Sequence, residues 1–143
     1  MHTLEIIKQE EIAAPIDIVF ETVLEQLGPL NETCDGLSLP MKLEAWPGGR
    51  WYRDLGNGAG HLWAHLQAIR PSTLLELYGP LFMSGPATSN VQYRLSEKNG
   101  VTSIQFSHRA VGLIPPAYLE GPEINIGWSS HLRRVREMAE RKK

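Results

Sequence analysis

The sequence has few of the features that would assign it to a specialised class of protein. It contains one cysteine, Cys34, so no disulfide can form within the chain. No apolar run is long enough to cross a bilayer, and the first residues lack the basic stretch and apolar core of a secretory signal. A formal net charge of −2 provides no overall attraction for nucleic acid or an anionic membrane. We therefore expect a cytoplasmic protein with no membrane span and no nucleic-acid partner.

Several catalytic and metal-binding motifs are also missing. No Gly-x-Ser-x-Gly elbow occurs, and Cys34 has no histidine near it in sequence. The glycines of residues 56–60 lack the spacing of a dinucleotide-binding loop and predict a hairpin turn instead. The spacing of His61 and His65 would pair two metal ligands on a helix, but in a strand four residues extend over about 13 Å. We therefore expect neither a cofactor nor a metal site.

The elements that are present indicate one α+β domain over residues 1–143. Residues 4–12 have the composition of a strand, and residues 16–27 carry apolar side chains at the spacings of three and four that are typical of a helix. Residues 41–110 contain short apolar runs separated by turn residues, which predicts an antiparallel meander. Asn99-Gly100 lies between two alternating runs and is a strong hairpin signal.

Alternation in the last two runs of this meander indicates which side chains face the core. Tyr93 lies in register with apolar neighbours two residues away, and Phe106 and His108 lie in register with Ile104. One face of the sheet is therefore expected to be buried and the other to be in contact with water.

The last segment predicts a long helix that covers the sheet. From about Glu123 it would be roughly 30 Å long, which is enough to cross a whole sheet. Its arginines, among them Arg133, Arg134 and Arg136, are expected on a solvated face. The order of strand, helix, several strands and long helix excludes a doubly wound parallel sheet. The predicted apolar stripe consists of Ile124, Trp128, Leu132, Val135 and Met138 or Ala139.

Three segments resemble the helix-grip superfamily, also called START-like or SRPBCC, which includes START lipid-transfer domains, polyketide cyclases and birch-pollen-allergen-like proteins. They are residues 12–20 (IAAPIDIVF), residues 46–52 (WPGGRWY) and residues 68–77, with AIRP followed by LLEL. Within this superfamily, Gly127-Trp128 at the start of the last helix resembles a bacterial single-domain branch related to the activator of heat-shock-protein ATPase, the Aha-like proteins.

The resemblance implies a curved antiparallel sheet wrapped around a long C-terminal helix, with one or two short helices after the first strand. It also implies a deep cavity between the sheet and that helix. Members of the superfamily mostly bind hydrophobic small molecules, so we expect a lipid-like or aromatic ligand in the cavity. The expected cavity residues are Trp63, His65, Tyr78, Tyr93, Phe106, His108, Trp128 and Leu132.

Two arrangements of the strand around residues 61–69 remain open. In the first, the core-facing residues are Leu62, Ala64, Leu66 and Ala68, and the residues on the wet face are His61, Trp63 and His65. In the second, the faces are reversed and both Trp63 and His65 line the cavity. Alternation along one strand does not decide between them.

Three functions are compatible with these features. The first is the binding of a hydrophobic molecule, and the second is an enzyme of cyclase, dehydratase or hydrolase type. His108 is the best candidate for an acid–base group in such an enzyme, although a structural role for a half-buried histidine is the more common case. The third function is a chaperone-associated protein-binding module, which the Aha-like branch suggests. A homodimer formed through exposed sheet edges is also compatible with the fold.

Overall fold

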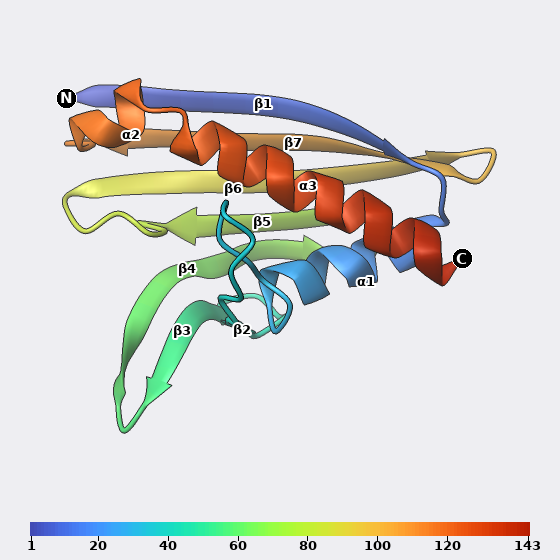
Figure 1. Ribbon diagram of the computed structural model, residues 1–143, viewed down its shortest axis with the longest axis horizontal. Helices are drawn as coiled ribbons and strands as arrows, with labels where there is room; N and C mark the ends of the chain where they lie inside the picture. Colours follow the sequence, from blue (N-terminus) through green and yellow to red (C-terminus); the bar gives the residue numbers. More distant parts are fainter.

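A computed structural model describes all of residues 1–143 and shows one curved, antiparallel seven-stranded sheet with a long helix across its concave face (Figure 1). The strand order is β1-β7-β6-β5-β4-β3-β2, and every neighbouring pair is antiparallel. The α+β prediction is therefore confirmed. The elements are β1 (His2–Ile12), α1 (Ile16–Leu27), β2 (Lys42–Leu43), β3 (Arg50–Gly56), β4 (Ala59–Arg70), β5 (Leu74–Gly79), β6 (Ala87–Lys98), β7 (Val101–Gly112), α2 (Pro116–Glu120) and α3 (Glu123–Lys142).

Helix α1 begins and ends where the sequence predicts. Pro15 precedes its first residue with φ −63°, and a residue without an N–H group fits there because the first N–H groups of a helix have no partner within it. At the other end, the N–H of Gly28 donates to the carbonyl oxygens of Leu24 and Glu25. The chain then turns away into residues 28–41, an irregular segment that passes in front of the sheet (Figure 1).

The core lies between the concave face of the sheet and the two helices α1 and α3. The predicted inward side chains of β6 and β7, Tyr93, Ile104 and Phe106, are almost fully buried. Asn99 and Gly100 form the hairpin between the strands with φ of 53° and 79°, as expected for a two-residue turn. The apolar stripe of α3 is confirmed at Ile124, Trp128, Leu132, Val135 and Ala139, which are all buried.

One arginine of α3 differs from the sequence prediction. Arg133 lies on the solvated surface, but the side chain of Arg134 is only 12% exposed. A helical position next to the apolar stripe is turned partly inward, so a long side chain there can bury its stem and reach a polar partner. The prediction of a fully solvated arginine face was therefore wrong at this position.

Strand β4 contains an extra residue at two places. Trp51 lies opposite Ala64 and Tyr52 lies opposite Leu62, so Trp63 is the extra residue of the first bulge. A second register shift follows further along β4, where it pairs with β5. Side chains along a strand point to the two faces of the sheet in turn. An extra residue therefore exchanges the faces of odd-numbered and even-numbered positions beyond the bulge.

Neither arrangement predicted for residues 61–69 holds along the whole strand. Ala64 and Leu66 are buried in the core, as in the first arrangement, but Leu62 is 41% exposed. Trp63 faces inward, as in the second arrangement, because the bulge turns it to the same side as Ala64. His65 lies on the convex face, where its ring stacks on Tyr78 with ring centroids 5.8 Å apart.

Gly79 fits closely beside this bulge. Its φ is +153°, and a Cβ atom there would lie 2.5 Å from the carbonyl oxygen of Trp63 and 2.7 Å from the Cα of Ala64. That carbonyl oxygen also accepts a hydrogen bond from the N–H of Leu81, at 2.7 Å. The backbone at Trp63 is therefore held by a neighbouring strand end that approaches too closely for any side chain.

We expect Gly79→Ala to lower the free energy of unfolding by about 1–3 kcal/mol, because the new methyl group must displace backbone atoms. Gly85→Ala is the matched control, since a Cβ atom there meets nothing within 4 Å, and it is expected to change stability by less than about 0.5 kcal/mol. Urea unfolding monitored by circular dichroism measures both. Equal stability of the two variants would show that the contact is unimportant.

Candidate functional site

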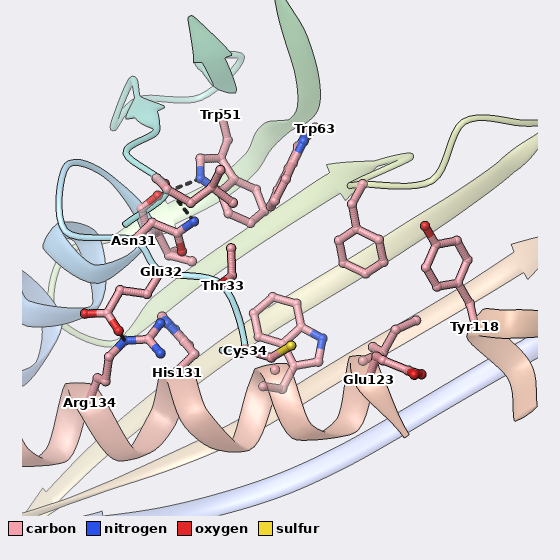
Figure 2. Close-up of a pocket in the computed structure, with 16 residues that line it drawn as sticks. Asn31, Glu32, Thr33, Cys34, Trp51, Trp63, Tyr118, Glu123, His131 and Arg134 are labelled. Carbon is pink, nitrogen blue, oxygen red and sulfur yellow. Dashed lines mark hydrogen bonds and ion pairs between the residues drawn. The ribbon is translucent and has the colours of Figure 1, made fainter. Parts of the chain in front are cut away.

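A cavity of about 320 Å³ lies between the N-terminal part of α3, strands β3 and β4, and residues 28–41 (Figure 2). Its volume is at the lower end of the range for small-molecule sites. Most of its wall is apolar. Strands β1, β5, β6 and β7 contribute no residue to this wall. The cavity therefore occupies only one part of the space between the sheet and α3.

Aromatic rings form one wall of the cavity (Figure 2). The ring of Trp63 meets the rings of Trp51 and Phe82 edge to face, with centroids 5.1 Å and 5.8 Å apart. Phe82 in turn contacts Tyr118 of α2 at 5.4 Å. Such edge-to-face pairs are a preferred geometry for aromatic rings, so the wall is held in place before any ligand binds.

Trp51 is fixed by a hydrogen bond as well as by packing. Its Nε1–H donates to the carbonyl oxygen of Leu27 at 2.8 Å, and the residue is only 2% exposed. Leu27 is the last residue of α1, where carbonyl groups have no partner within the helix. This bond therefore ties the end of α1 to the aromatic wall.

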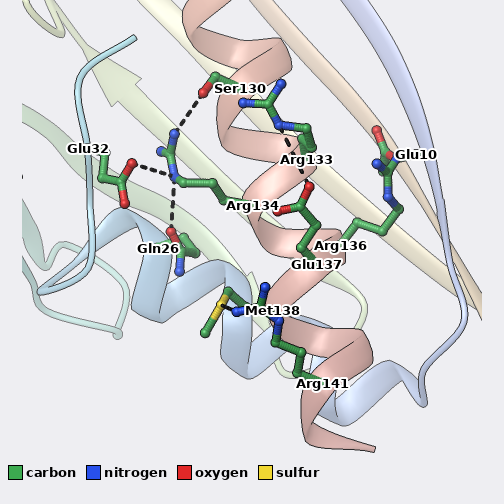
Figure 3. A network of polar contacts seen from close by, with 10 residues as sticks. All are labelled: Glu10, Gln26, Glu32, Ser130, Arg133, Arg134, Arg136, Glu137, Met138 and Arg141. Atoms are coloured by element: carbon green, nitrogen blue, oxygen red, sulfur yellow. Dashed lines mark hydrogen bonds and ion pairs between the residues drawn. The ribbon is translucent and has the colours of Figure 1, made fainter. Parts of the chain in front are cut away.

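A polar group of side chains stands at the other end of the cavity. Arg134 Nε donates to Gln26 Oε1 at 3.2 Å and its Nη1 donates to Ser130 Oγ at 2.9 Å. Nε also lies 3.8 Å from Glu32 Oε1, so the ion pair connects α3 with the segment of residues 28–41 (Figure 3). Burial lowers the pKa of Arg134, and the charge of Glu32 opposes this effect.

His131 lines the cavity next to this group and is 3% exposed. Its Nε2 lies 2.8 Å from the hydroxyl oxygen of Tyr93, which is fully buried. Burial raises the pKa of Tyr93 well above its usual value, so the phenol keeps its proton. Burial, followed by the charge of Arg134, lowers the pKa of His131 to about 3, so the imidazole is neutral at pH 7.

Counting hydrogen-bond partners determines where the imidazole proton is. If the Tyr93 hydroxyl donates to Nε2, the proton of the neutral ring is on Nδ1, and only that donor remains unpaired. In the other tautomer, both the Tyr93 hydroxyl proton and the Nδ1 lone pair would be left without a partner. Nδ1 is the one buried side-chain nitrogen or oxygen without a hydrogen-bond partner in the protein. Leaving such a group unpaired costs about 1–3 kcal/mol.

His108 has a different environment from the one expected of an acid–base group. It is completely buried, the Nε1–H of Trp128 donates to its Nδ1 at 3.0 Å, and its Nε2 donates to Ser89 Oγ at 2.9 Å. Burial lowers its pKa to about 4. Both ring nitrogens are therefore occupied, and His108 does not belong to the cavity wall.

The structure brings together only part of the predicted set of cavity residues. Trp63 and Trp128 line the cavity, whereas Tyr93, Phe106, His108 and Leu132 lie in the core behind it. His65 and Tyr78 are on the convex face, and Tyr78 is 43% exposed, so their predicted position in the cavity was wrong. The cause is the bulge at Trp63, which places Trp63 and His65 on opposite faces of the sheet.

Sequence reasoning missed His131, Arg134, Trp51 and the residues of the segment 28–41. A signal for His131 existed, because it lies three residues after Trp128 and such a spacing brings two side chains to the same side of a helix. The contribution of Asn31 and Glu32 had no such signal, since irregular segments carry no periodicity.

None of the helices combines the length and apolar character that crossing a bilayer requires. No three histidine, cysteine, aspartate or glutamate side chains lie close enough together to hold a metal ion.

The curved sheet wrapped around α3 is the helix-grip fold, and solved structures share this fold. The Zhui aromatase/cyclase from Streptomyces sp. R1128 matches with a TM-score of 0.68 and 17% identity over 99% of this chain and 96% of that chain. Ara h 8.0201 matches with a TM-score of 0.68 and 11% identity over 96% and 98% of the two chains.

CalU16 from Micromonospora echinospora matches with a TM-score of 0.64 and 21% identity over 94% of this chain and 73% of that chain. No family model and no curated protein matches the sequence. The predicted helix-grip fold is therefore confirmed, while the Aha-like branch within it stays a prediction.

Proposed function

We propose that the protein binds a hydrophobic small molecule, aromatic or lipid-like, in the cavity between the curved sheet and α3. The observation that carries this proposal is the largely apolar cavity of about 320 Å³ beside a core of 24 buried apolar residues. Sites for small molecules are typically concave, mostly apolar and supplied with a few polar groups. This cavity has each of these properties.

The aromatic wall favours an aromatic ligand over a purely aliphatic one. Trp51, Trp63 and Phe82 present edges and faces to the cavity, and a planar ligand can pack against them in the offset or edge-to-face geometry that rings prefer. One structural neighbour is an aromatase/cyclase, which supports the same class of ligand.

The acid–base alternative has less support from the geometry. His108 has no free ring nitrogen, and His131, which does line the cavity, has a pKa of about 3. A general base works best when its pKa is near the operating pH, so His131 is a poor one at pH 7. The chaperone-associated alternative depends on the resemblance to the Aha-like branch alone.

Binding of the neutral fluorescent probe N-phenyl-1-naphthylamine tests the proposal. We expect the wild-type protein to bind it with one site per chain, and Trp63→Ala to weaken binding about tenfold or more, since the loss of one ring contact of about 1.4 kcal/mol has that effect. The matched control is Trp46→Ala, because Trp46 is 57% exposed and lies outside the cavity wall.

The control variant should bind the probe as the wild type does. If wild type does not bind, or if the two tryptophan variants bind equally, the cavity is not the site and the proposal fails. Far-UV circular dichroism of both variants verifies that they remain folded.

A further inference from the structure

Among the buried side-chain nitrogen and oxygen atoms at the cavity, all but one are paired within the protein. Asn31 Nδ2 donates to the carbonyl oxygen of Leu39 at 3.1 Å, and Trp63 Nε1 lies 3.2 Å from Nδ1 of His61. Arg134 donates to Gln26 and Ser130, as described above. What remains is Nδ1 of His131, which is buried and has no partner.

The partner that is missing is an acceptor. The hydroxyl of Tyr93 uses Nε2 of His131 as its acceptor, so the tautomer of the ring makes Nδ1 a donor. His131 lines the cavity but its Nδ1 atom is buried, so a ligand acceptor must press into this part of the wall to reach it. Such a donor discriminates strongly, because a ligand that lacks the matching acceptor leaves it unpaired. The dyad of Tyr93 and His131 thus requires a hydrogen-bond acceptor on the ligand and determines where that acceptor must lie.

The charges near this donor favour a neutral acceptor over an anion. Arg134 is the only cation in the cavity wall, and Glu32 lies 3.8 Å from it. A ligand carboxylate at this end would therefore be close to the carboxylate of Glu32, and it would also lose its hydration on entering an apolar site. A carbonyl oxygen accepts the same hydrogen bond without either disadvantage.

We infer that the cavity selects aromatic ligands that carry a ketone, quinone or similar carbonyl group, whose oxygen accepts a hydrogen bond from Nδ1 of His131. This inference rests on the proposed function, because it names the chemical class of the ligand for the same cavity. His131 is here a specificity-determining residue, and Tyr93 is a positioning residue that fixes its tautomer.

A pair of probes with the same shape tests this selection. Fluorene and fluorenone differ in one carbonyl group, and displacement of N-phenyl-1-naphthylamine reports the affinity of each. We expect wild-type protein to bind fluorenone about tenfold more tightly than fluorene, which is the effect of one good hydrogen bond. Fluorene-9-carboxylate, the anionic analogue, is expected to bind more weakly than fluorenone.

Variants of the dyad assign the preference to His131. In His131→Phe/Tyr93→Phe both polar groups are replaced together, so no unpaired hydroxyl remains, and the preference for fluorenone is expected to disappear while fluorene still binds. In Tyr93→Phe alone the donor can persist, and part of the preference should remain.

Nuclear magnetic resonance of wild-type protein provides a test that does not depend on any variant. Nitrogen-15 shifts of His131 should show the proton on Nδ1, and the Nδ1–H signal should move on addition of fluorenone but not of fluorene. A proton on Nε2 in the free protein, or equal affinity for fluorene and fluorenone, would overturn the inference while leaving the proposed function intact. If neither probe binds, the proposed function itself fails.

Discussion

The free energy of unfolding is expected to decrease by about 4 kcal/mol between pH 7 and pH 5, which is a large part of the stability of a typical domain. Two buried histidines cause this effect. Burial lowers the pKa of His108 from 6.5 to about 4, and burial followed by the charge of Arg134 lowers the pKa of His131 from 6.5 to about 3. Each histidine contributes about 2 kcal/mol over this range, at 1.36 kcal/mol per pH unit below 6.5.

The direction of the effect follows from proton binding. Both rings are neutral in the folded protein at pH 5, whereas in the unfolded chain they are protonated below pH 6.5, so acid favours unfolding. Stability is therefore complete above pH 6.5 and falls as the pH decreases towards 4 and 3, the folded-state values. Between pH 7 and 5 most carboxylates stay ionised, which leaves the histidines as the main contributors.

Urea unfolding at several pH values measures how the free energy of unfolding changes with pH. Nuclear magnetic resonance signals of the histidine rings identify which residues cause the change. The Cε1–H signals of His108 and His131 should stay unchanged from pH 8 to pH 5. If either signal titrates with a midpoint near 6.5, that histidine is accessible in the folded state and this account of the pH dependence is wrong.

Replacement of Trp128 by alanine is expected to lower the free energy of unfolding by about 3–5 kcal/mol, as is common for large aromatic residues in a core. The ring of Trp128 packs against Phe106 with centroids 4.7 Å apart and also contacts His131 at 5.7 Å. The variant in addition leaves Nδ1 of the buried His108 without its hydrogen-bond donor. The cavity becomes larger at the same time, because Trp128 forms part of its wall.

Trp128→Phe separates packing from hydrogen bonding. It keeps most of the ring but removes the N–H donor, so we expect a smaller loss of about 1–3 kcal/mol. Urea denaturation measures the stability of both variants, and an unchanged m-value shows that the difference lies in stability. Trp46→Ala is the control, because Trp46 is an exposed tryptophan. A loss of less than about 1 kcal/mol in Trp128→Ala would mean that α3 is not anchored to the sheet through this residue.

Much of the fold could be predicted because its signals are local. The spacing of Trp128, Leu132 and Val135 identifies the buried side of α3, and Asn99-Gly100 identifies the hairpin between β6 and β7. These signals are the helical period of 3.6 residues, the strand period of two residues, and a turn whose residues need positive φ. Each of them is contained within one short segment of the chain.

The cavity wall was harder to predict because its positions depend on contacts between distant segments. Whether Trp63 or His65 faces inward is decided by the pairing of β4 with β3 and by the close approach of Gly79, and neither is visible in the alternation of β4 itself. Arg134 is drawn inward by Gln26 and Glu32, which belong to α1 and to the irregular segment after it.

The bulge in β4 also suggests how the cavity can change during evolution. Because Trp63 is the one residue inserted between Leu62 and Ala64, its deletion would remove its ring from the wall and restore regular pairing with β3, while Trp51 and Trp128 stay in place. Insertions and deletions within a strand can thus exchange the lining of the cavity in a single step. Point substitutions, by comparison, change it one side chain at a time.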